Sequence, residues 1–326
     1  MPLIPKRKPT GTFEVGAGYS TDHGFAFMAR IAQTRLFGTD KQLSLTAKLA
    51  ERSQDFRMRY EDPSLFDPQL RLRGDLFSTR KLYPGFTREA AGADLSLTRT
   101  IAPHLEVFVG YRAEGVRVEP NDITLATRGT QPAEPLWRGG FLSSLRAGLA
   151  YSDVDVPTYP TRGTTIGTTL EVADRELGSD LSYFRTDAWF GHHRPLGPFT
   201  LHLGARVRTI TDVPISERLH FDGSSDIRGF APGAIGPKDP GGQPTGGNLL
   251  WSARGELEAP LVGDLHVAGF VDVGGLRDAY AGQTAASTGV GLIWRSPIGP
   301  LRFDIAFPLT GDDRGPRYIF GIGGMF

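Results

Sequence analysis

The residues best suited to chemistry lie in a turn-rich stretch, residues 221–248, around a compact charged and aromatic segment, Asp226 to Phe230. An arginine guanidinium can bond a carboxylate through two parallel N–H donors, a geometry that the ammonium group of lysine cannot reproduce. Glycine lets the backbone turn where a side chain would clash, so Gly229 allows Phe230 to pack against an inner wall. We therefore single out Arg228, and the alternative is a solvated arginine in a mobile loop.

Signs of enzymatic chemistry are missing from the sequence. The 326 residues include no cysteine, which removes disulfides, cysteine-ligated zinc and thiol catalysis together. The seven histidines show no metal-ligand spacing, and no H-E-x-x-H, G-x-S-x-G or phosphate-loop pattern occurs. We expect no enzyme, no metal and no cofactor. The 36 basic and 36 acidic residues balance without a dense basic stripe, so we also expect no nucleic-acid partner.

Hydropathy excludes one kind of membrane protein and leaves another open. No window approaches the ~18 consecutive apolar residues that a membrane-spanning helix needs. The mean hydropathy of -0.22 does not exclude a transmembrane barrel, because barrel strands alternate apolar and polar residues and average to a mildly hydrophilic chain. The basic N-terminus lacks the apolar run of a signal peptide, so we interpret residues 1–12 as a linker leading into a mature fragment.

Period-two alternation is the main evidence for a barrel. In residues 301–307 every odd position is apolar, and Arg302 and Asp304 stand on the opposite face. Residues 199–208 and 249–258 repeat the rule, with arginine, glutamate and histidine on the hidden face. A soluble sandwich could alternate in the same way, but this dense mixture of charges fits a polar lumen behind a lipid-facing wall better. We predict that the outer wall includes Trp251, Leu301, Phe303, Ile305 and Phe307.

Sixteen such segments follow one another, from residues 13–20 to residues 317–326, each closed by Gly, Pro, Asp or Asn. An even number of strands is what single-chain bacterial barrels require. Short turns alternate with longer loops, which include 120–136 and 274–285, as they do between the two ends of such a barrel. The predicted fold class is therefore all-β, with one sixteen-stranded antiparallel transmembrane β-barrel over residues 13–326.

The chain ends on an aromatic strand. Tyr318, Phe320 and Ile322 share one face of this strand with the terminal Phe326. Aromatic side chains gather at the membrane interfaces of a barrel, so we interpret Phe326 as a C-terminal signal that belongs to such a girdle. The alternative is the last strand of a soluble sheet.

Several motifs occur in an order that resembles a known family. The loop core Ile227, Arg228, Gly229 and Phe230 resembles the Val/Ile-Arg-Gly-Phe/Tyr signature in the sixth extracellular loop of the BamA/TamA outer-membrane assembly superfamily, whose barrels are also described as surface-antigen domains. The segments that look like that family's last five strands are GGN at 246–248, ELEAP at 256–260, FVDVGG at 270–275, residues 288–309 and the terminal FGIGGMF. The N-terminal half matches more loosely, and the resemblance covers essentially the whole chain.

This resemblance implies a role for the long loop. In the family the loop, here at about 211–247, folds back into the barrel lumen and its arginine meets carboxylates on nearby strands. Through the matching segments, the resemblance implies that Glu256 and Asp272 are these carboxylates. The alternation also places both side chains, and that of Glu258, in the lumen. The resemblance further implies POTRA modules ahead of the barrel, which have no counterpart in this sequence and which receive substrates and accessory partners.

Glycines mark the first and last strands as a candidate weak seam. Gly16 and Gly18 lie in the first strand, and Gly321, Gly323 and Gly324 lie in the last. A glycine inside a strand weakens it by about 0.5–1 kcal/mol relative to alanine. An opened seam presents unpaired backbone donors and acceptors, which is the condition for adding a strand from another chain. The alternative is that these glycines make room for lumen side chains.

Together these features predict a factor that folds and inserts β-barrel proteins into the outer membrane of a Gram-negative bacterium, through the weak seam and without nucleotide. The expected partners are outer-membrane lipids, unfolded barrel proteins and, through POTRA modules, periplasmic chaperones and accessory lipoproteins. Three alternatives stay open: a TamA-type or two-partner-secretion-type pore that translocates polypeptides, a passive channel, and a related protein of an organellar outer membrane.

Overall fold

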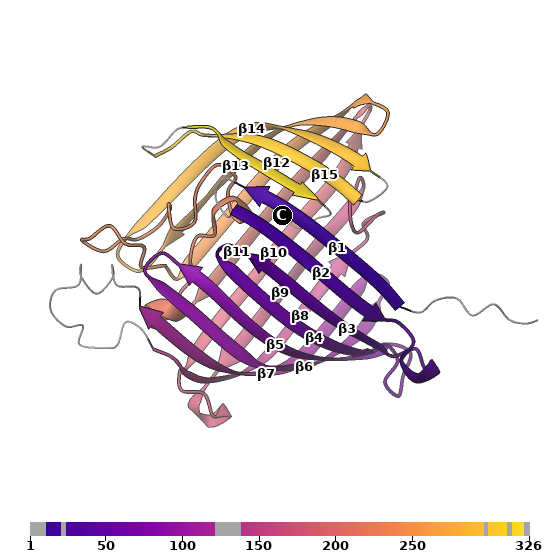
Figure 1. Ribbon diagram of the computed structural model, residues 1–326, viewed down its shortest axis with the longest axis vertical. Coiled ribbons are helices and arrows are strands. Elements are labelled where there is room, and N and C mark those ends of the chain that lie inside the picture. The colour runs from indigo at the N-terminus through magenta and orange to yellow at the C-terminus, as the bar shows by residue number, and fades with distance from the viewer. Residues whose placement is uncertain (1–10, 21–23, 121–137, 297–298, 312–314, 323–326) are drawn as a thin grey trace, which may run out of the picture.

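The protein is a closed β-barrel. A computed structural model describes residues 11–20, 24–120, 138–296, 299–311 and 315–322. Within these ranges sixteen antiparallel strands form one sheet, in which each strand pairs with its neighbours in the sequence and β1 closes the ring on β16 (Figure 1). The strands are β1 (Gly11–Ser20), β2 (Gly24–Gln33), β3 (Gln42–Ala50), β4 (Ser53–Asp62), β5 (Leu70–Tyr83), β6 (Phe86–Ala102), β7 (Leu105–Pro120), β8 (Gly140–Ser152), β9 (Gly163–Ala173), β10 (Tyr183–Leu196), β11 (Phe199–Ile210), β12 (Leu249–Val262), β13 (Leu265–Arg277), β14 (Gly282–Ser296), β15 (Gly299–Pro308) and β16 (Arg317–Ile322).

The predicted fold class and the predicted number of strands are confirmed. Four short 3-10 helices interrupt the connections: η1 (Leu36–Gly38), η2 (Arg175–Leu177), η3 (Ile215–Glu217) and η4 (Gly223–Ser225). In the described part of the chain, no helix is long and apolar enough to cross a membrane.

The two ends of the barrel differ in their connections. At the end where β1 begins, the connections at 103–104, 197–198 and 263–264 are tight turns; we call this the turn end. The opposite end carries the segments 174–182 and 211–248; we call it the loop end. The predicted alternation of short turns and long loops is only partly present, because connections 51–52, 84–85 and 278–281 at the loop end are short and connection 153–162 at the turn end is long. The expected loop at 120–136 lies outside the described residues from position 121 onward.

The prediction of a long loop at 274–285 is wrong. β13 continues to Arg277 and β14 begins at Gly282, so only residues 278–281 connect them. Gly274 is typical of a turn, yet it lies inside β13, where an added Cβ would stand 2.4 Å from the backbone oxygen of Trp251 on β12 and 2.9 Å from Cδ1 of Ile227. The glycine therefore leaves space for the neighbouring strand and for the loop that packs against β13.

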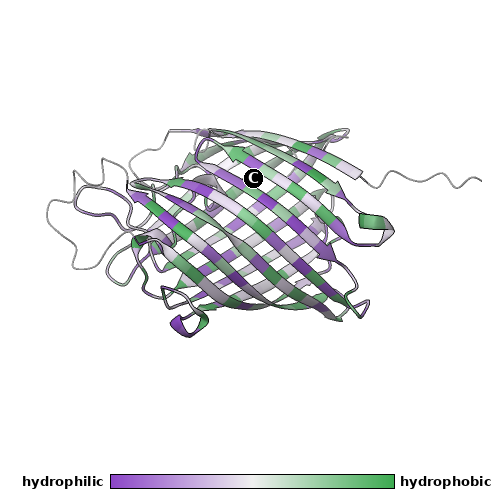
Figure 2. Cartoon of the chain, turned by 60° about the horizontal axis from the view of Figure 1, so that its bottom comes forward, coloured by the Kyte–Doolittle hydropathy of each residue, from purple (hydrophilic) through white to green (hydrophobic). Residues whose placement is uncertain are grey.

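Hydrophobic and hydrophilic residues alternate along the strands, as the colours in Figure 2 show, and many large apolar side chains are exposed. On β15, Phe303 and Phe307 are exposed on the outside, while Asp304 and Ala306 between them are buried on the inside. Leu301 and Ile305 share the outer face of β15. Trp251 lies on the outer face of β12, because its neighbour Leu250 is buried inside. The lipid-facing wall is therefore the one that the alternation predicts.

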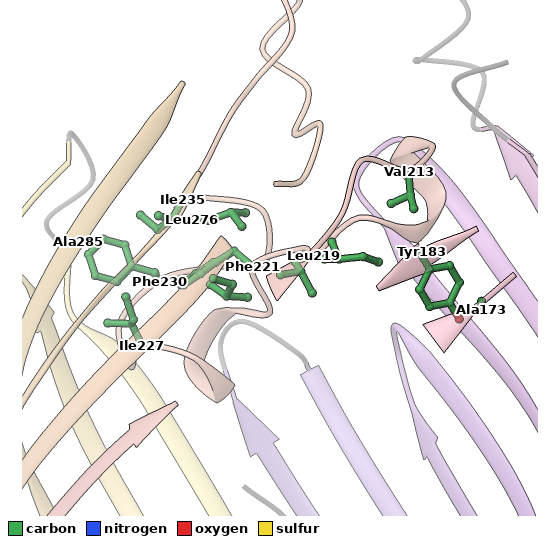
Figure 3. Packing of buried hydrophobic residues seen from close by; sticks show 12 residues of the cluster. Ala173, Tyr183, Val213, Leu219, Phe221, Ile227, Phe230, Ile235, Leu276 and Ala285 are labelled. Carbon is green, nitrogen blue, oxygen red and sulfur yellow. The ribbon is translucent and has the colours of Figure 1, made fainter. Parts of the chain in front are cut away.

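The main apolar core lies inside the lumen at the loop end. Segment 211–248, which we call the lumen loop, folds into the barrel and fills this end with apolar side chains (Figure 3). Ile227 is fully buried at its centre. The cluster consists of Ala173, Tyr183, Ile210, Val213, Leu219, Phe221, Ile227, Phe230, Ile235, Leu250, Leu276 and Ala285. The barrel wall and the lumen loop thus share one core.

Candidate functional site

A tight backbone turn positions Arg228. The helix η4 ends at Ser225, Asp226 follows it, and the amide of Ile227 donates to the carbonyl of Gly223 at 3.0 Å. The carboxylate of Asp226 accepts the amide of Asp222 at 2.7 Å, and Arg254 on β12 donates to the Asp226 carbonyl at 2.9 Å. These bonds fix the backbone immediately before Arg228, so its side chain leaves the loop in one direction.

Gly229 completes the turn with a backbone conformation that favours glycine. Its φ is +94°, in the left-handed region, and an added Cβ would stand 3.3 Å from the Cβ of Ala306 on β15. The close approach of the loop to β15 therefore requires a residue without a side chain. Phe230 follows and packs in the apolar cluster with Phe221, at 6.5 Å between ring centroids.

The guanidinium of Arg228 binds carboxylates from three strands. Its Nε and Nη2 donate to the two oxygens of Asp272 on β13, at 2.8 and 2.7 Å. The backbone amide of Arg228 also donates to Asp272, at 3.1 Å. Nη1 donates to Glu256 on β12 at 2.9 Å and to Asp304 on β15 at 3.4 Å. Arg228 thus makes the bidentate contact expected for an arginine with Asp272 and a single bond to Glu256, the other carboxylate that the sequence indicated.

A second arginine completes the cluster. Arg302 on β15 donates to Glu256 at 2.9 Å and to Asp304 at 2.9 and 2.8 Å. The guanidinium carbon of Arg228 lies 3.5 Å from the centroid of the Phe270 ring, a cation–π contact that the burial of both groups strengthens. The sequence analysis placed Arg302 and Asp304 on an inner face but assigned them no partner, and it missed Phe270. The alternation of β13 could have found Phe270, since its ring shares the inner face with Asp272.

Mutual ion pairing and hydrogen bonding explain why this cluster can be buried. Burial disfavours the charged form of Arg228, but the hydrogen bonds and the charges of Asp272 and Glu256 outweigh that effect, so the pKa of Arg228 is raised above its ordinary value. Asp272 is fully buried and Arg228 is only 8% exposed. Two arginines and three carboxylates share these bonds, so removing one partner would leave a buried charge uncompensated.

Further ion pairs fasten the lumen loop to the wall. Asp222 accepts Lys81 of β5 at 2.8 Å. Glu217 accepts two bonds from Arg88 of β6, at 2.9 and 3.0 Å. Asp226 pairs with Arg208 of β11. Together with the Arg228 cluster, these bonds connect the loop to strands on both sides of the lumen.

A second buried carboxylate lies toward the turn end. Glu258 on β12 is 1% exposed and lies 2.8 Å from Arg295 and 2.7 Å from His266. It also accepts the hydroxyl of Tyr159. Tyr159 belongs to residues 153–162, the connection between β8 and β9, which we call the inner turn. The guanidinium of Arg295 stands over the Tyr159 ring at 4.4 Å, so the inner turn is held inside the lumen.

A cavity separates the lumen loop from the inner turn. Its volume is about 360 Å³, and its lining includes Arg228, Tyr159 and, from β16, Ile319 and Gly321. The arginine cluster and the inner turn therefore both face the lumen side of the last strand. Among the described residues, no group of three or more histidine and carboxylate side chains has the arrangement needed to hold a metal ion.

Within the described residues, the seam between β1 and β16 has the register pairs Gly18–Gly321, Tyr19–Phe320 and Ser20–Ile319. On its other side β1 pairs with β2 along its whole length, from Gly11 to Ser20. Gly18 and Gly321, two of the glycines indicated by the sequence, stand directly opposite each other.

The other predicted seam residues have different positions. Gly16 pairs with Met28 on β2 and lies beyond the described seam pairs. Gly323, Gly324 and the terminal Phe326 lie outside the described residues. Their proposed roles in the seam and in the aromatic girdle stay predictions.

A closed sixteen-stranded barrel with a lipid-facing wall and an arginine-anchored loop in its lumen defines a class of outer-membrane β-barrel proteins. The chain belongs to the Omp85 superfamily, whose superfamily domain matches residues 35–326. It is 28% identical to outer membrane protein assembly factor BamA of Nitratidesulfovibrio vulgaris, over 98% of this chain and 42% of that protein. It is 26% identical to the protein of the same name from Neisseria meningitidis serogroup B, over 98% of this chain and 47% of that protein.

The chain therefore spans less than half the length of these two relatives. Among solved structures, the crystal structure of BamA from Haemophilus ducreyi lacking POTRA domains 1-3 matches with a TM-score of 0.80 at 21% identity, over 97% of this chain and 71% of that chain. This likeness concerns the fold.

Proposed function

We propose that this chain is the barrel of an outer-membrane protein assembly factor, which folds and inserts other β-barrel proteins through the β1–β16 seam. The observation that carries the proposal is that, within the described residues, β1 has three register pairs with β16 and ten with β2. The names of the two relatives support it, since both are outer membrane protein assembly factors. The proposed activity makes and breaks no covalent bond, so the protein is not an enzyme in this proposal.

The seam would act by offering an edge. When β1 and β16 separate, each presents a row of unpaired N–H and C=O groups, and such groups are costly to leave without partners next to lipid. An incoming strand from a client can satisfy them by β-strand addition. The Arg228 cluster joins β12, β13 and β15, so it would hold the wall beside the seam in shape while the seam opens.

The partners follow from this mechanism and from the family. Unfolded β-barrel proteins are the clients, and outer-membrane lipids surround the outer wall. Periplasmic chaperones and accessory lipoproteins would act through POTRA modules, as the resemblance implies. We propose the outer membrane of a Gram-negative bacterium as the site of action.

A disulfide across the seam tests the proposal. Because the chain has no cysteine of its own, the pair Tyr19→Cys and Phe320→Cys places two thiols on directly opposed residues. Opposed residues have Cβ atoms about 4.5–5.5 Å apart, close to the separation that a disulfide needs. The matched control is Tyr19→Cys with Phe25→Cys, an opposed pair on the permanent β1–β2 side.

The assay is the folding of an unfolded barrel protein in liposomes that contain each variant. The seam variant carries cysteines at 19 and 320. We expect oxidation to abolish its acceleration of client folding and reduction to restore it. The control variant should accelerate folding in both states. Full activity of the oxidised seam variant would reject gating at this seam and favour polypeptide transport through the lumen.

A further inference from the structure

A second cavity, on the inner wall formed by β4 to β8, is lined mainly by arginines. Its volume is about 320 Å³, and we call it the arginine cavity. The arginines that line it are Arg57, Arg59, Arg71, Arg73, Arg112 and Arg146. Among the described residues, its lining contains three carboxylates, Asp75, Asp94 and Glu106, and no lysine.

The three carboxylates of the lining pair with half of these arginines. The pairs within the cavity are Arg59 with Asp75, Arg71 with Glu106, and Arg146 with Asp94. The other arginines pair with carboxylates outside the lining, Arg57 with Asp55, Arg73 with Glu61, and Arg112 with Glu114. The surface of the cavity itself therefore carries more positive groups than negative ones.

The arginines of this cavity have unused hydrogen-bond donors. A guanidinium has five N–H donors, and the Arg228 side chain makes four bonds to three carboxylates. Among the described residues, the side chains of Arg71 and Arg146 make one bond each. The Nε atoms of Arg71, Arg73 and Arg146 are buried without a hydrogen-bond acceptor in this part of the chain, which costs free energy. An anion bound among them would supply acceptors once the side chains turn toward it.

An aromatic ring holds two of the arginines in place. The guanidinium carbons of Arg112 and Arg57 lie 4.5 and 5.8 Å from the centroid of the Phe77 ring. Phe77 is buried, so its ring forms a fixed floor for these cation–π contacts. Because a guanidinium that stacks on a ring keeps its N–H donors in its own plane, the stacking does not use up those donors.

The spread of the arginines indicates a ligand with two anionic groups. Arg71 and Arg73 lie on β5, and Arg146 lies on β8, three strands away. Neighbouring strands are about 4.8 Å apart, so these two strands are separated by about 14 Å around the wall. A single phosphate group would meet only part of this wall, whereas a solute with two phosphates can meet arginines from both strands.

The position of the cavity favours a ligand from the water phase. Arg71 and Glu106 are the second residues of β5 and β7, and both strands begin at the turn end. Among the described residues, the inner turn contributes none to the lining. The lining belongs to the inner face, so the sheet separates it from the acyl chains of the bilayer. A soluble anion can therefore enter from the turn end, while a lipid would have to cross the wall.

We propose that the arginine cavity binds a small water-soluble solute that carries two phosphate groups. Arginine suits this ligand because its planar donors bond phosphate oxygens in pairs. The proposal concerns binding without a covalent step, and it does not depend on the assembly activity.

Calorimetric titration of the full chain, folded in detergent micelles at low ionic strength, tests the proposal. The probe is fructose 1,6-bisphosphate, and its matched control is fructose 6-phosphate, the same sugar with one phosphate. We expect the bisphosphate to bind about tenfold more tightly or better, because the second phosphate adds charge-assisted bonds. No measurable binding of the bisphosphate would overturn the proposal. Equal affinities for the two sugars would also contradict it, since the site would then not recognise two phosphates.

Two arginine variants separate this site from general attraction in the lumen. Arg71→Gln removes a cavity arginine whose partner, Glu106, has a side chain that is 41% exposed and can therefore remain unpaired. Arg206→Gln is the matched control, because Arg206 pairs with Asp187 and does not line the cavity.

We expect Arg71→Gln to weaken binding of the bisphosphate by about tenfold, and Arg206→Gln to change it by less than about twofold. Equal weakening in the two variants would reject the cavity as the site. The comparison of the two sugars uses the unchanged chain, so it decides the question even where a variant does not fold.

Discussion

At the scale of single residues, the barrel depends on one arginine that is brought in by a loop. Arg228 offers a planar set of donors to Asp272, Glu256 and Asp304. Glu256 and Asp304 also pair with Arg302. The fully buried Asp272 receives both its side-chain bonds from Arg228. The loop and the wall therefore stabilise each other through a contact that neither can replace.

Replacing Arg228 should destabilise the barrel strongly. We expect Arg228→Ala to lower the free energy of unfolding by about 3–5 kcal/mol, because Asp272 is left buried without its partner. The free energy of unfolding of Arg228→Lys should lie between those of the unchanged protein and of Arg228→Ala, since lysine keeps the charge and loses the bidentate geometry. Urea unfolding in vesicles gives the measurement. The control is Arg30→Ala, which removes the exposed Arg30–Glu14 pair and should cost at most about 1 kcal/mol.

The docking of the lumen loop should weaken in mild acid because of His220. Burial lowers the pKa of His220 from 6.5 to about 4, and the nearby charges of Lys81 and Arg218 act in the same direction. Its bond to the carbonyl of Ile215 and the charge of Asp222 oppose the shift without cancelling it. The undocked loop therefore takes up a proton below pH 6.5, while the docked loop does not until pH approaches 4.

This difference is worth about 3 kcal/mol in favour of the docked loop above pH 6.5, and it is lost as pH falls toward 4. We expect the thermal midpoint of the barrel to drop between pH 7.5 and pH 5.0. His220→Gln should show a smaller drop. If both proteins lose the same amount, His220 does not control the docking.

At the scale of strands, the lipid-facing wall predicts that a charged side chain placed on the outer face of β15 lowers stability. Phe303 lies in the middle of β15 on the outer face. An arginine at the bilayer midplane costs about 2–4 kcal/mol in a barrel strand, so Phe303→Arg should lose that much stability in vesicles. Phe303→Leu, which keeps the face apolar, should stay close to the unchanged protein. Equal stability of the two variants would mean that this face does not meet the acyl chains.

The seam should exchange its amide hydrogens faster than the rest of the barrel. Ile319 to Gly321 pair with only a short part of β1, whereas β13 is paired with β12 and β14 along nearly its full length. Local opening requires less free energy where fewer contacts hold a segment. Hydrogen exchange in vesicles should therefore show β16 deuterated before residues 268–274 of β13. Simultaneous exchange of both strands would argue against a weak seam.

At the scale of the whole molecule, the sequence predicted the wall better than the lumen. Alternation is a local property, so it correctly located sixteen strands and the outward faces of Phe303 and Phe307. It directed Asp304 inward but could not show that Arg228, 76 residues away, would reach it. Gly274 was interpreted as part of a loop because the sequence alone does not show that Ile227 packs against it. Contacts between distant segments depend on the closed shape, which no local pattern records.

The inner turn has a consequence for the membrane as a barrier. The lumen loop occupies one mouth of the barrel, and Tyr159 holds residues 153–162 inside the other through Glu258. We expect the protein to conduct few ions in planar bilayers and Tyr159→Phe to conduct more, while Tyr280→Phe, at a 97% exposed tyrosine, should match the unchanged protein. Equal currents from all three would contradict a closed turn end. Under the proposed mechanism, a barrel closed at both mouths would open sideways toward lipid without forming a pore, so small solutes, toxins and antibiotics would gain no route through the membrane while a client is inserted.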